Sequence, residues 1–276
     1  MEGSAPEVAV IGGGPAGVAA AYQCKREGVD DVIIVEKNKI GGLIEYANRI
    51  ENIPGYLDMD GRAVVSELES LLKRANISVL KGGVEDIQGE RGNFRIHMKE
   101  GNITCRHAVV ATGTIPRTLG IDGEVCHPPW KDYHGKRVLV VGGGDAAYDY
   151  ALRINRYGGK VTILSRNTSA LDLLVRRVGK ESIREVRGEL DRWEKHGHGY
   201  TVDTTGGTIE CDLVVTAIGR VPQLPVKGYG EIRFPTGCTD IPGLYVIGSA
   251  ALDRFRQVTL CWGMGIAAAM DIASHR

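Results

Sequence analysis

The sequence has no surplus of charge of either sign, and this absence excludes whole classes of partner. Its 276 residues include 34 Lys plus Arg and 34 Asp plus Glu, so the formal net charge is zero. Proteins that coat nucleic acids or adhere to anionic membranes carry an excess of positive charge. We therefore expect no nucleic-acid partner.

A long hydrophobic run is also missing. The longest stretch without a charged side chain, Val8 to Cys24, contains four glycines and Pro15. A membrane-spanning helix needs about 20 predominantly apolar residues. The first residues, Met1 to Glu7, have neither the basic segment nor the apolar core of a secretory signal. We expect no membrane span and no secretion.

The cysteines lack the spacing of a metal site or of a redox pair. They are scattered along the chain at positions 24, 105, 126, 211, 238 and 261. Neither C-x-x-C spacing nor a third ligand beside His196 and His198 is found, so we predict no metal site. Scattered single cysteines are typical of reduced thiols in a cytoplasmic protein.

Glycine, in contrast, is abundant, with 38 residues. Several of them form a loop between an expected strand and an expected helix. The apolar run Val8 to Ile11 is followed by Gly12-Gly13-Gly14-Pro15-Ala16-Gly17, a helical pattern from 15 to 27, and a second run, 32–35, that ends in Glu36. Such an order of strand, glycine loop, helix, strand and acid is typical of a dinucleotide-binding unit.

The same order recurs downstream. The run 138–141 leads into Gly142-Gly143-Gly144-Asp145-Ala146-Ala147, a helical pattern follows to about Tyr157, and residues 161–164 form the next expected strand. Two such units predict an α/β fold with two Rossmann-like dinucleotide-binding domains. The charged stretch 171–195 favours a solvated helix face, with a docking surface for a partner as the alternative.

The spacing in the first unit has a chemical reason. The first glycine allows a tight turn, the second lets the backbone approach a pyrophosphate, and the third permits close helix–strand packing. The pyrophosphate then lies at the positive end of the helix. Glu36, placed after the second strand, can accept hydrogen bonds from ribose hydroxyls. These residues predict a bound dinucleotide.

Several further segments resemble the low-molecular-weight thioredoxin reductases, which are flavoproteins with two dinucleotide-binding domains. They are Gly41-Gly42, Glu51-Asn52-Ile53-Pro54-Gly55, Ala111-Thr112-Gly113, 217–222 and 241–248, with Arg256-Gln257 beyond. The resemblance spans residues 8 to 272. It implies an FAD-binding domain formed by residues 1–119 and 224–276, an inserted NAD(P)-binding-like domain at 120–223, and a homodimer.

The resemblance also implies site residues. Those expected to bind FAD are Gly12, Gly14, Pro15, Ala16, Gly17, Glu36, Lys37, Gly42, Leu43, Asn52, Val84, Ala111, Thr112, Gly113, Gly248, Ser249, Arg256, Gln257 and Val258. Those expected to bind NADPH or NADH are Gly142, Gly144, Asp145, Ala146, Ser165, Arg166, Asn167, Ile218 and Gly219.

The chain departs from this family at the redox centre. The family's C-x-x-C falls just before the second glycine loop, where this chain has Val125-Cys126-His127-Pro128 and no second cysteine. Dithiol exchange needs one thiol to attack and another to resolve the mixed disulfide. Cys126 is either a lone reactive thiol, and so a catalytic candidate, or an inert cysteine.

The second nucleotide site departs as well. Where the family holds the 2′-phosphate of NADPH with a His-Arg-Arg group and a later Arg, this chain has Ser165, Arg166 and Asn167, with Leu171 further on. Only one cation remains, and we expect no carboxylate there to bind an NAD ribose. Ser249 also replaces an Asp that meets the flavin ribityl chain in the family.

Two classes of function are compatible with this sequence. The first is an FAD-dependent oxidoreductase that transfers electrons between NAD(P)H or another carrier and an unidentified small-molecule or protein acceptor. Ferredoxin–NADP reductases of this fold, which also lack the cysteine pair, are one form of it. The second is a non-catalytic flavin-binding protein, either a sensor or part of a larger assembly. Two retained glycine loops favour the enzyme.

Overall fold

The computed structural model describes residues 5–55, 59–90 and 92–275. It contains two compact units. The first unit comprises Met1–Glu45, Glu51–Ile115 and Pro222–Arg276, and the second comprises Tyr46–Ile50 and Pro116–Val221. Residues 1–4 and 276, at the ends of the expected FAD-binding ranges, lie outside the described residues.

A five-stranded parallel sheet forms the centre of the first unit. Its strand order is β17-β7-β1-β2-β3. The strands are β17 (Leu244–Val246), β7 (His107–Val110), β1 (Val8–Ile11), β2 (Val32–Glu36) and β3 (Ser78–Lys81). All residues of β1, β7 and β17 are buried, which explains their continuous apolar sequences, since a parallel sheet is covered on both faces.

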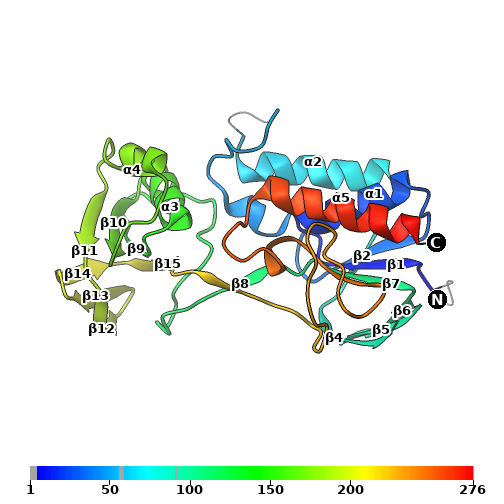
Figure 1. Cartoon of the computed structure of the whole chain (residues 1–276). Coiled ribbons are helices and arrows are strands. Elements are labelled where there is room, and N and C mark those ends of the chain that lie inside the picture. Colours follow the sequence, from blue (N-terminus) through cyan, green and yellow to red (C-terminus); the bar gives the residue numbers. More distant parts are fainter. Residues whose placement is uncertain (1–4, 56–58, 91, 276) are drawn as a thin grey trace. The chain divides into compact units, whose positions relative to one another are not determined.

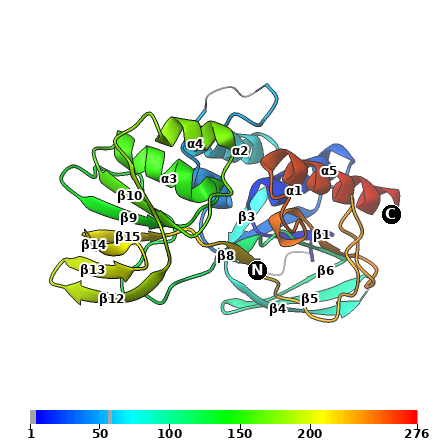
Figure 2. The same cartoon turned by 60° about the vertical axis from the view of Figure 1, so that its left-hand side comes forward.

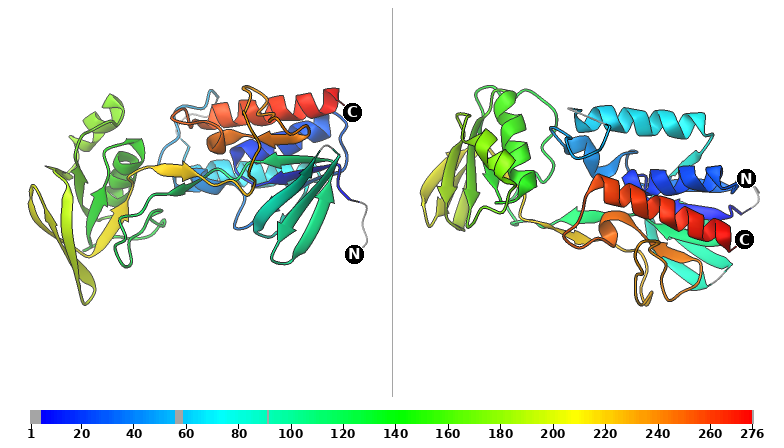
Figure 3. Two further views of the ribbon diagram at one scale, coloured as in Figure 1. Left: turned by 60° about the horizontal axis from the view of Figure 1, so that its bottom comes forward. Right: turned by 45° about the horizontal axis from the view of Figure 1, so that its top comes forward.

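Three helices cover one face of this sheet: α1 (Pro15–Arg26), α2 (Gly61–Arg74) and α5 (Val258–Ser274) (Figure 1). Asp60 begins α2, because its carboxylate accepts hydrogen bonds from the N–H groups of Arg62 (2.9 Å) and Ala63 (3.1 Å). The red helix α5 lies along the blue helix α1 (Figure 3). Short 3-10 turns, η1 (Gly42–Tyr46) and η2 (Gly248–Ala250), follow strands β2 and β17 in the chain.

The other face of the sheet packs against an antiparallel meander of β4 (Val84–Glu90), β5 (Asn93–Met98) and β6 (Gly101–Cys105). Phe94 and Ile96 of the meander share a buried cluster with Ala9 and Ile11 of β1. The central sheet of the first unit is therefore enclosed on both sides.

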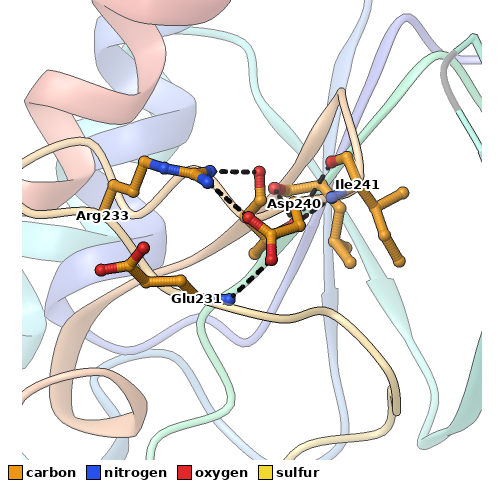
Figure 4. Close-up of polar contacts among 6 residues, drawn as sticks. Glu231, Arg233, Asp240 and Ile241 are labelled. Carbon is orange, nitrogen blue, oxygen red and sulfur yellow. Dashed lines mark hydrogen bonds and ion pairs between the residues drawn. The ribbon is translucent and has the colours of Figure 1, made fainter.

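A network of hydrogen bonds connects both sides of the long loop that leads into β17. Arg233 contacts the carboxylate of Asp240 and donates a hydrogen bond to the Thr239 carbonyl at 2.9 Å. The N–H of Glu231 donates to the other oxygen of Asp240 at 3.1 Å (Figure 4). These bonds and the Arg233 charge lower the pKa of the Asp240 carboxyl, with the Glu231 N–H as the largest cause. These contacts join residues 231, 233, 239 and 240 within the loop before β17.

The second unit has its own parallel sheet, in the order β11-β10-β9-β15. The strands are β9 (Arg137–Val141), β10 (Lys160–Ser165), β11 (Arg184–Arg187) and β15 (Leu213–Thr216). Val138 and Val140 face the cluster under helices α3 (Asp145–Arg156) and α4 (Asp172–Val178). Leu139 and Val141 belong to a second buried cluster, which also contains residues of an antiparallel meander. Figure 2 shows this meander beside the sheet of the second unit.

That meander consists of β12 (Leu190–His196), β13 (Gly199–Thr204) and β14 (Gly207–Cys211). The expectation of a helix over 171–195 is therefore wrong. Helix α4 ends at Val178, and strands β11 and β12 follow it. Val186 is buried in the sheet and Trp193 packs on the same cluster, so apolar residues between the charges select strands here. The chain leaves the first unit through β8 (Thr114–Pro116) and returns through β16 (Arg220–Pro222), and these two strands pair.

Within the described ranges, no helix is both long enough and apolar enough to cross a membrane.

Candidate functional site

The predicted FAD-binding residues come together because parallel strands end at one edge of the first unit's sheet. Gly12 follows β1, Glu36 ends β2, Ala111 follows β7 and Gly248 follows β17. Strand order places β1 between β2 and β7, with β17 next to β7. Four loops from distant parts of the sequence therefore surround one place, which is where open α/β sheets bind ligands.

Gly12 makes the tight turn at the centre of this edge. Its φ is +109°, a conformation that L side chains rarely adopt. A Cβ atom at Gly12 would lie only 2.4 Å from the carbonyl oxygen of Ala111. A side chain is excluded both by the backbone conformation and by the neighbouring loop, as a dinucleotide cradle requires.

Glu36 fixes the shape of the glycine loop. Its Oε2 accepts a hydrogen bond from the N–H of Gly13 and its Oε1 accepts one from the N–H of Asn38, both at 2.7 Å. Each carboxylate oxygen has a second lone pair, so Glu36 can still accept hydrogen bonds from two ribose hydroxyls. Glu36 thus has both a structural and a ligand-binding capacity.

Helix α1 begins at this loop and leaves its positive end uncapped. Gly14 is the N-cap and makes no side-chain capping hydrogen bond, and the first turn, which starts with Pro15, contains no acidic residue. The first N–H groups of a helix, together with its dipole, attract an anion. This donor set fits a pyrophosphate.

Other predicted residues lie beside this cradle. A Cβ atom at Gly42 would lie 3.4 Å from Cα of Gly14, and one at Gly248 would lie 2.7 Å from Cβ of Ala16. The side chains of Asn52 and Gln257 form a hydrogen bond with each other. Leu43, Val84, Thr112, Gly113, Arg256 and Val258 belong to the same unit as these residues.

Two side chains near the cradle have hydrogen-bond partners that the sequence did not predict. Lys37 donates a hydrogen bond from Nζ to Oε1 of Gln223 at 3.0 Å, and Thr112 donates to the Gln223 carbonyl. Ser249, expected to face the flavin, has its Oγ 3.6 Å from Sγ of Cys261. Gln223 was missed because its contacts arise only where the chain re-enters the first unit.

The second glycine loop repeats the construction of the first. Gly142 has a φ of +148°, and a Cβ atom there would lie 2.3 Å from the Ala217 carbonyl oxygen. Helix α3 starts with Asp145 after the uncapped Gly144. Asp145 Oδ1 accepts a hydrogen bond from the N–H of Leu171 at 2.8 Å, which holds the loop after β10 against the glycine loop. This loop, which shares its unit with Ala146, Ile218 and Gly219, has the same glycine geometry as the first cradle, but the carboxylate of Asp145 lies in the first turn of α3.

A carboxylate lies beside Arg166, where the sequence led us to expect none. Glu189 Oε1 lies 3.7 Å from Nη1 of Arg166, and both side chains are exposed. Glu189 comes from the loop after β11, and the register of the sheet pairs Ser165 with Arg187 two residues earlier. The position of Glu189 could not be predicted from the sequence, because only the strand order of the sheet shows that β11 neighbours β10.

Cys126 lies half-buried in the second unit and is not activated by its surroundings. Burial raises the pKa of its thiol, the nearby Glu124 carboxylate raises it further, and Arg220 offsets this only in part. All six cysteines of the chain are free thiols. The thiolate is the reactive form of cysteine, so a raised pKa favours the inert interpretation.

His127, next to Cys126, is held as a neutral ring. It stacks on Tyr46 with ring centres 4.7 Å apart, and its Nε2 lies 3.4 Å from Nη1 of Arg220. Burial, and then the Arg220 charge, lower the pKa of His127 to about 4. The stacking partner Tyr46 was not foretold by the sequence, since it lies 81 positions away in a loop of the expected FAD domain.

The residues that the structure describes contain no group of three or more His, Cys, Asp or Glu side chains placed to hold a metal ion.

Comparison with known proteins agrees with this architecture. The model of the family "pyridine nucleotide-disulphide oxidoreductase" matches residues 6–265. The chain is 27% identical to the ferredoxin–NADP reductase of Gluconacetobacter diazotrophicus, covering 89% of this chain and 84% of the relative. It is also 27% identical to an alkyl hydroperoxide reductase polypeptide of Xanthomonas campestris pv. phaseoli over 98% of this chain, but it spans only 57% of that relative's length.

Among solved structures, the thioredoxin reductase of T. acidophilum superposes with a TM-score of 0.84 at 25% identity, covering 98% of each chain. The α/β architecture with two Rossmann-like halves is therefore shared with a thioredoxin reductase over nearly its whole length.

Proposed function

The chain belongs to the pyridine nucleotide-disulphide oxidoreductase family, and from that premise we propose that it transfers electrons from NADPH or NADH, through FAD, to an acceptor other than a dithiol partner. As a family member it is a flavin-dependent oxidoreductase. The observation that carries the proposal is the pair of glycine cradles, each closed by an alanine carbonyl, in a chain that has a single cysteine where the resemblance places a redox pair.

The first cradle is proposed to hold FAD. Glu36 would accept the ribose hydroxyls, the N–H groups at the start of α1 would bind the pyrophosphate, and Gly12 leaves room for the turn. The Asn52–Gln257 pair joins the segment 51–55 to the start of α5, where the resemblance places the isoalloxazine ring. Bound FAD supplies chemistry that no side chain has, since it accepts a hydride and releases electrons singly or in pairs.

The second cradle is proposed to hold the nicotinamide dinucleotide. The uncapped start of α3 would bind its pyrophosphate, and Ser165, Arg166 and Asn167 would lie toward its ribose. Arg166 favours a 2′-phosphate, whereas Glu189 opposes one and can accept hydrogen bonds from free hydroxyls. We infer weak discrimination between NADPH and NADH.

The acceptor is proposed to take electrons from the flavin without a protein disulfide. A dithiol route needs a second thiol near Cys126, and no second cysteine stands at C-x-x-C spacing from Cys126 in the sequence. A ferredoxin–NADP reductase-like exchange with a protein carrier is the alternative, supported by the similarity to the Gluconacetobacter diazotrophicus enzyme. The two proposals differ in the acceptor, which is a small molecule in the first and a protein carrier in the second.

A homodimer in the cytoplasm is part of the proposal. Ile266 and Met270 of α5 lie four residues apart on one helix face and are 41% and 53% exposed. An apolar helix face of this kind suits a second copy of the chain, and free thiols suit a reducing compartment. Light scattering should give twice the chain mass, and Met270→Glu should give monomer.

The deciding experiment is anaerobic stopped-flow measurement of flavin absorbance after mixing with NADPH, NADH or reduced ferredoxin. The protein should purify yellow with one FAD per chain, and either nucleotide should bleach it within seconds. A colourless protein that cannot be reconstituted would refute the FAD site. Flavin that is reduced by ferredoxin alone would favour the alternative carrier exchange, and flavin reduced by none of the three would indicate a non-catalytic flavoprotein.

A further inference from the structure

Five residues of the chain interrupt the first unit and pack within the second. These residues, Tyr46–Ile50, are called the strap below. On one side they continue η1, and on the other they precede the segment 51–55. Both neighbouring segments belong to the expected flavin-binding part of the sequence. The strap is thus a segment of the second unit whose neighbours in the sequence belong to the first.

Two side chains of α3 hold the strap by its backbone. Arg153 donates from Nη1 to the carbonyl of Tyr46 at 3.1 Å and from Nη2 to the carbonyl of Pro128 at 2.5 Å. Asp149 Oδ2 accepts a hydrogen bond from the N–H of Asn48 at 2.8 Å. Asp149 and Arg153 are four residues apart and so lie on one face of the helix.

Arg153 is held inside the second unit. It is 1% exposed, and its guanidinium carbon lies 4.4 Å from the ring centre of Trp130 and 5.5 Å from that of Tyr150. A buried guanidinium loses its hydration, and an apolar side chain of similar volume would fill the same space without that penalty. What the charge adds is a pair of strong hydrogen bonds to two carbonyls, one in the strap and one beside the Cys126–His127 segment.

We propose that Arg153 is a positioning residue that, with Asp149, clamps the strap to α3 and thereby couples nucleotide binding at the start of α3 to the order of the flavin-side segments. The coupling rests on the proposed function of the two cradles. The clamp itself rests only on the hydrogen bonds within the second unit.

The helix supplies the connection. Helix α3 runs from Asp145 to Arg156 without interruption and starts at the glycine loop of the second cradle. A nucleotide bound there would accept hydrogen bonds from the N–H groups of the first turn and so hold that turn, which is one turn before Asp149 and two before Arg153. Tyr46, stacked on His127, and the Asn48 N–H then follow the helix because they are bound to it or to the segment that Arg153 also holds.

The test is hydrogen exchange of the strap amides in the FAD-loaded protein, with and without NADP⁺ or NAD⁺, which bind without reducing the flavin. In wild type, saturating nucleotide should slow strap exchange about tenfold. Arg153→Met should speed it about tenfold and abolish the nucleotide effect, since about one net hydrogen bond is lost. Arg153→Lys should restore part of the protection. Arg156→Met, an exposed change on the same helix, is the matched control and should behave as wild type.

The outcomes separate the clamp from simple loss of folding. The amides of β9 report the core of the second unit and should stay protected in every variant. If Arg153→Met exposes them, Asn48→Pro decides, because it removes the N–H group that donates to Asp149 and leaves α3 unchanged. The proposal would be overturned if the strap amides of Asn48→Pro exchanged at the wild-type rate and slowed with nucleotide as in wild type. It would also be overturned if neither NADP⁺ nor NAD⁺ changed the exchange rate of the strap amides in the wild-type protein. Failure of the flavin to be reduced, in contrast, would count against the proposed function and leave the nucleotide-free exchange result standing.

Discussion

Glu189 Oε1 lies 3.7 Å from Nη1 of Arg166, and both side chains are exposed. In the proposed nucleotide site, the guanidinium of Arg166 would attract a 2′-phosphate and the carboxylate of Glu189 would repel it. Under that proposal, the preference between NADPH and NADH would depend on two exposed side chains that can be altered separately.

Glu189→Gln should raise the ratio of flavin reduction rates, NADPH over NADH, by about three- to fivefold, because exposed charge pairs contribute up to about 1 kcal/mol. Arg166→Ala should lower the same ratio. The measurement is anaerobic stopped-flow reduction with both nucleotides at subsaturating concentration. Glu194→Gln, another exposed glutamate paired with an arginine, is the control and should leave the ratio unchanged. An unchanged ratio in Glu189→Gln would contradict this role.

Gly12→Ala and Gly14→Ala should both lose FAD, but only Gly12→Ala should also lose stability. A Cβ atom at Gly12 would meet the Ala111 carbonyl at 2.4 Å, so this variant should lose about 2 kcal/mol or more of stability as well as FAD. At Gly14 no atom lies within 4 Å, so the apoprotein should keep its stability while the new methyl group obstructs the pyrophosphate. Denaturant titration of both apoproteins and the FAD content after purification check this pair. Equal destabilisation would show that the cradle geometry is wrong.

Glu36→Gln should weaken FAD retention while the glycine loop keeps its conformation. The amide oxygen can still accept one of the two backbone hydrogen bonds that Glu36 now accepts. Hydrogen bonds to a charged group contribute about 1.5–3 kcal/mol, so FAD affinity should fall by at least tenfold. Fluorescence titration of the apoprotein with FAD measures it. Full affinity in the variant would place the ribose elsewhere.

Cys126→Ser should leave flavin reduction unchanged, and the wild-type thiol should react with iodoacetamide more slowly than free cysteine at pH 7.5. Burial and Glu124 raise the pKa of this thiol, so little thiolate is present. Mass spectrometry of the labelled peptide over time gives the rate. Rapid labelling, together with thioredoxin reduction that disappears in Cys126→Ser, would reinstate a thiol mechanism.

Asp149→Asn should stabilise the protein at pH 7 by on the order of 2 kcal/mol. Burial raises the pKa of Asp149 to about 6, above its ordinary value of 3.8. The folded state therefore binds more protons than the unfolded state between about pH 4 and pH 6, and stability falls as the pH rises through that window. The amide oxygen of Asn can keep the hydrogen bond from Asn48 without the buried charge. Urea unfolding at pH 7 and pH 4.5 should show the gain at the higher pH and little at the lower, with Asp191→Asn as an exposed control.

Local patterns in the sequence were sufficient for the cradles. The strands at 8–11 and 138–141, the glycine loops after them and the helices that follow lie within short windows, and each signal depends on neighbours in the chain. Glu36 could be found in the same way, because a Rossmann unit fixes how far the acid lies from the first glycine.

Features that depend on strand order and on buried polar contacts could not be found. Glu189 reaches Arg166 only because β11 lies next to β10 in the sheet. Arg153 has the sequence context of an ordinary basic residue near a helix C-terminus, and nothing local indicates that it is buried. The charged segment 184–196 likewise forms strands, because Val186 and Trp193 pack on the core. The many charged residues around these two gave no sign of strands.

The close contact of Gly12 with the Ala111 carbonyl has a twin in the contact of Gly142 with the Ala217 carbonyl, at 2.4 Å and 2.3 Å. In both halves the strand that follows the meander delivers an alanine carbonyl onto the first glycine of the loop. The obstructing atom is a backbone oxygen in both halves, and a backbone atom cannot turn aside as the end of a flexible side chain can. No exchange of the side chain at Ala111 or Ala217 could therefore make room for a Cβ atom at Gly12 or Gly142.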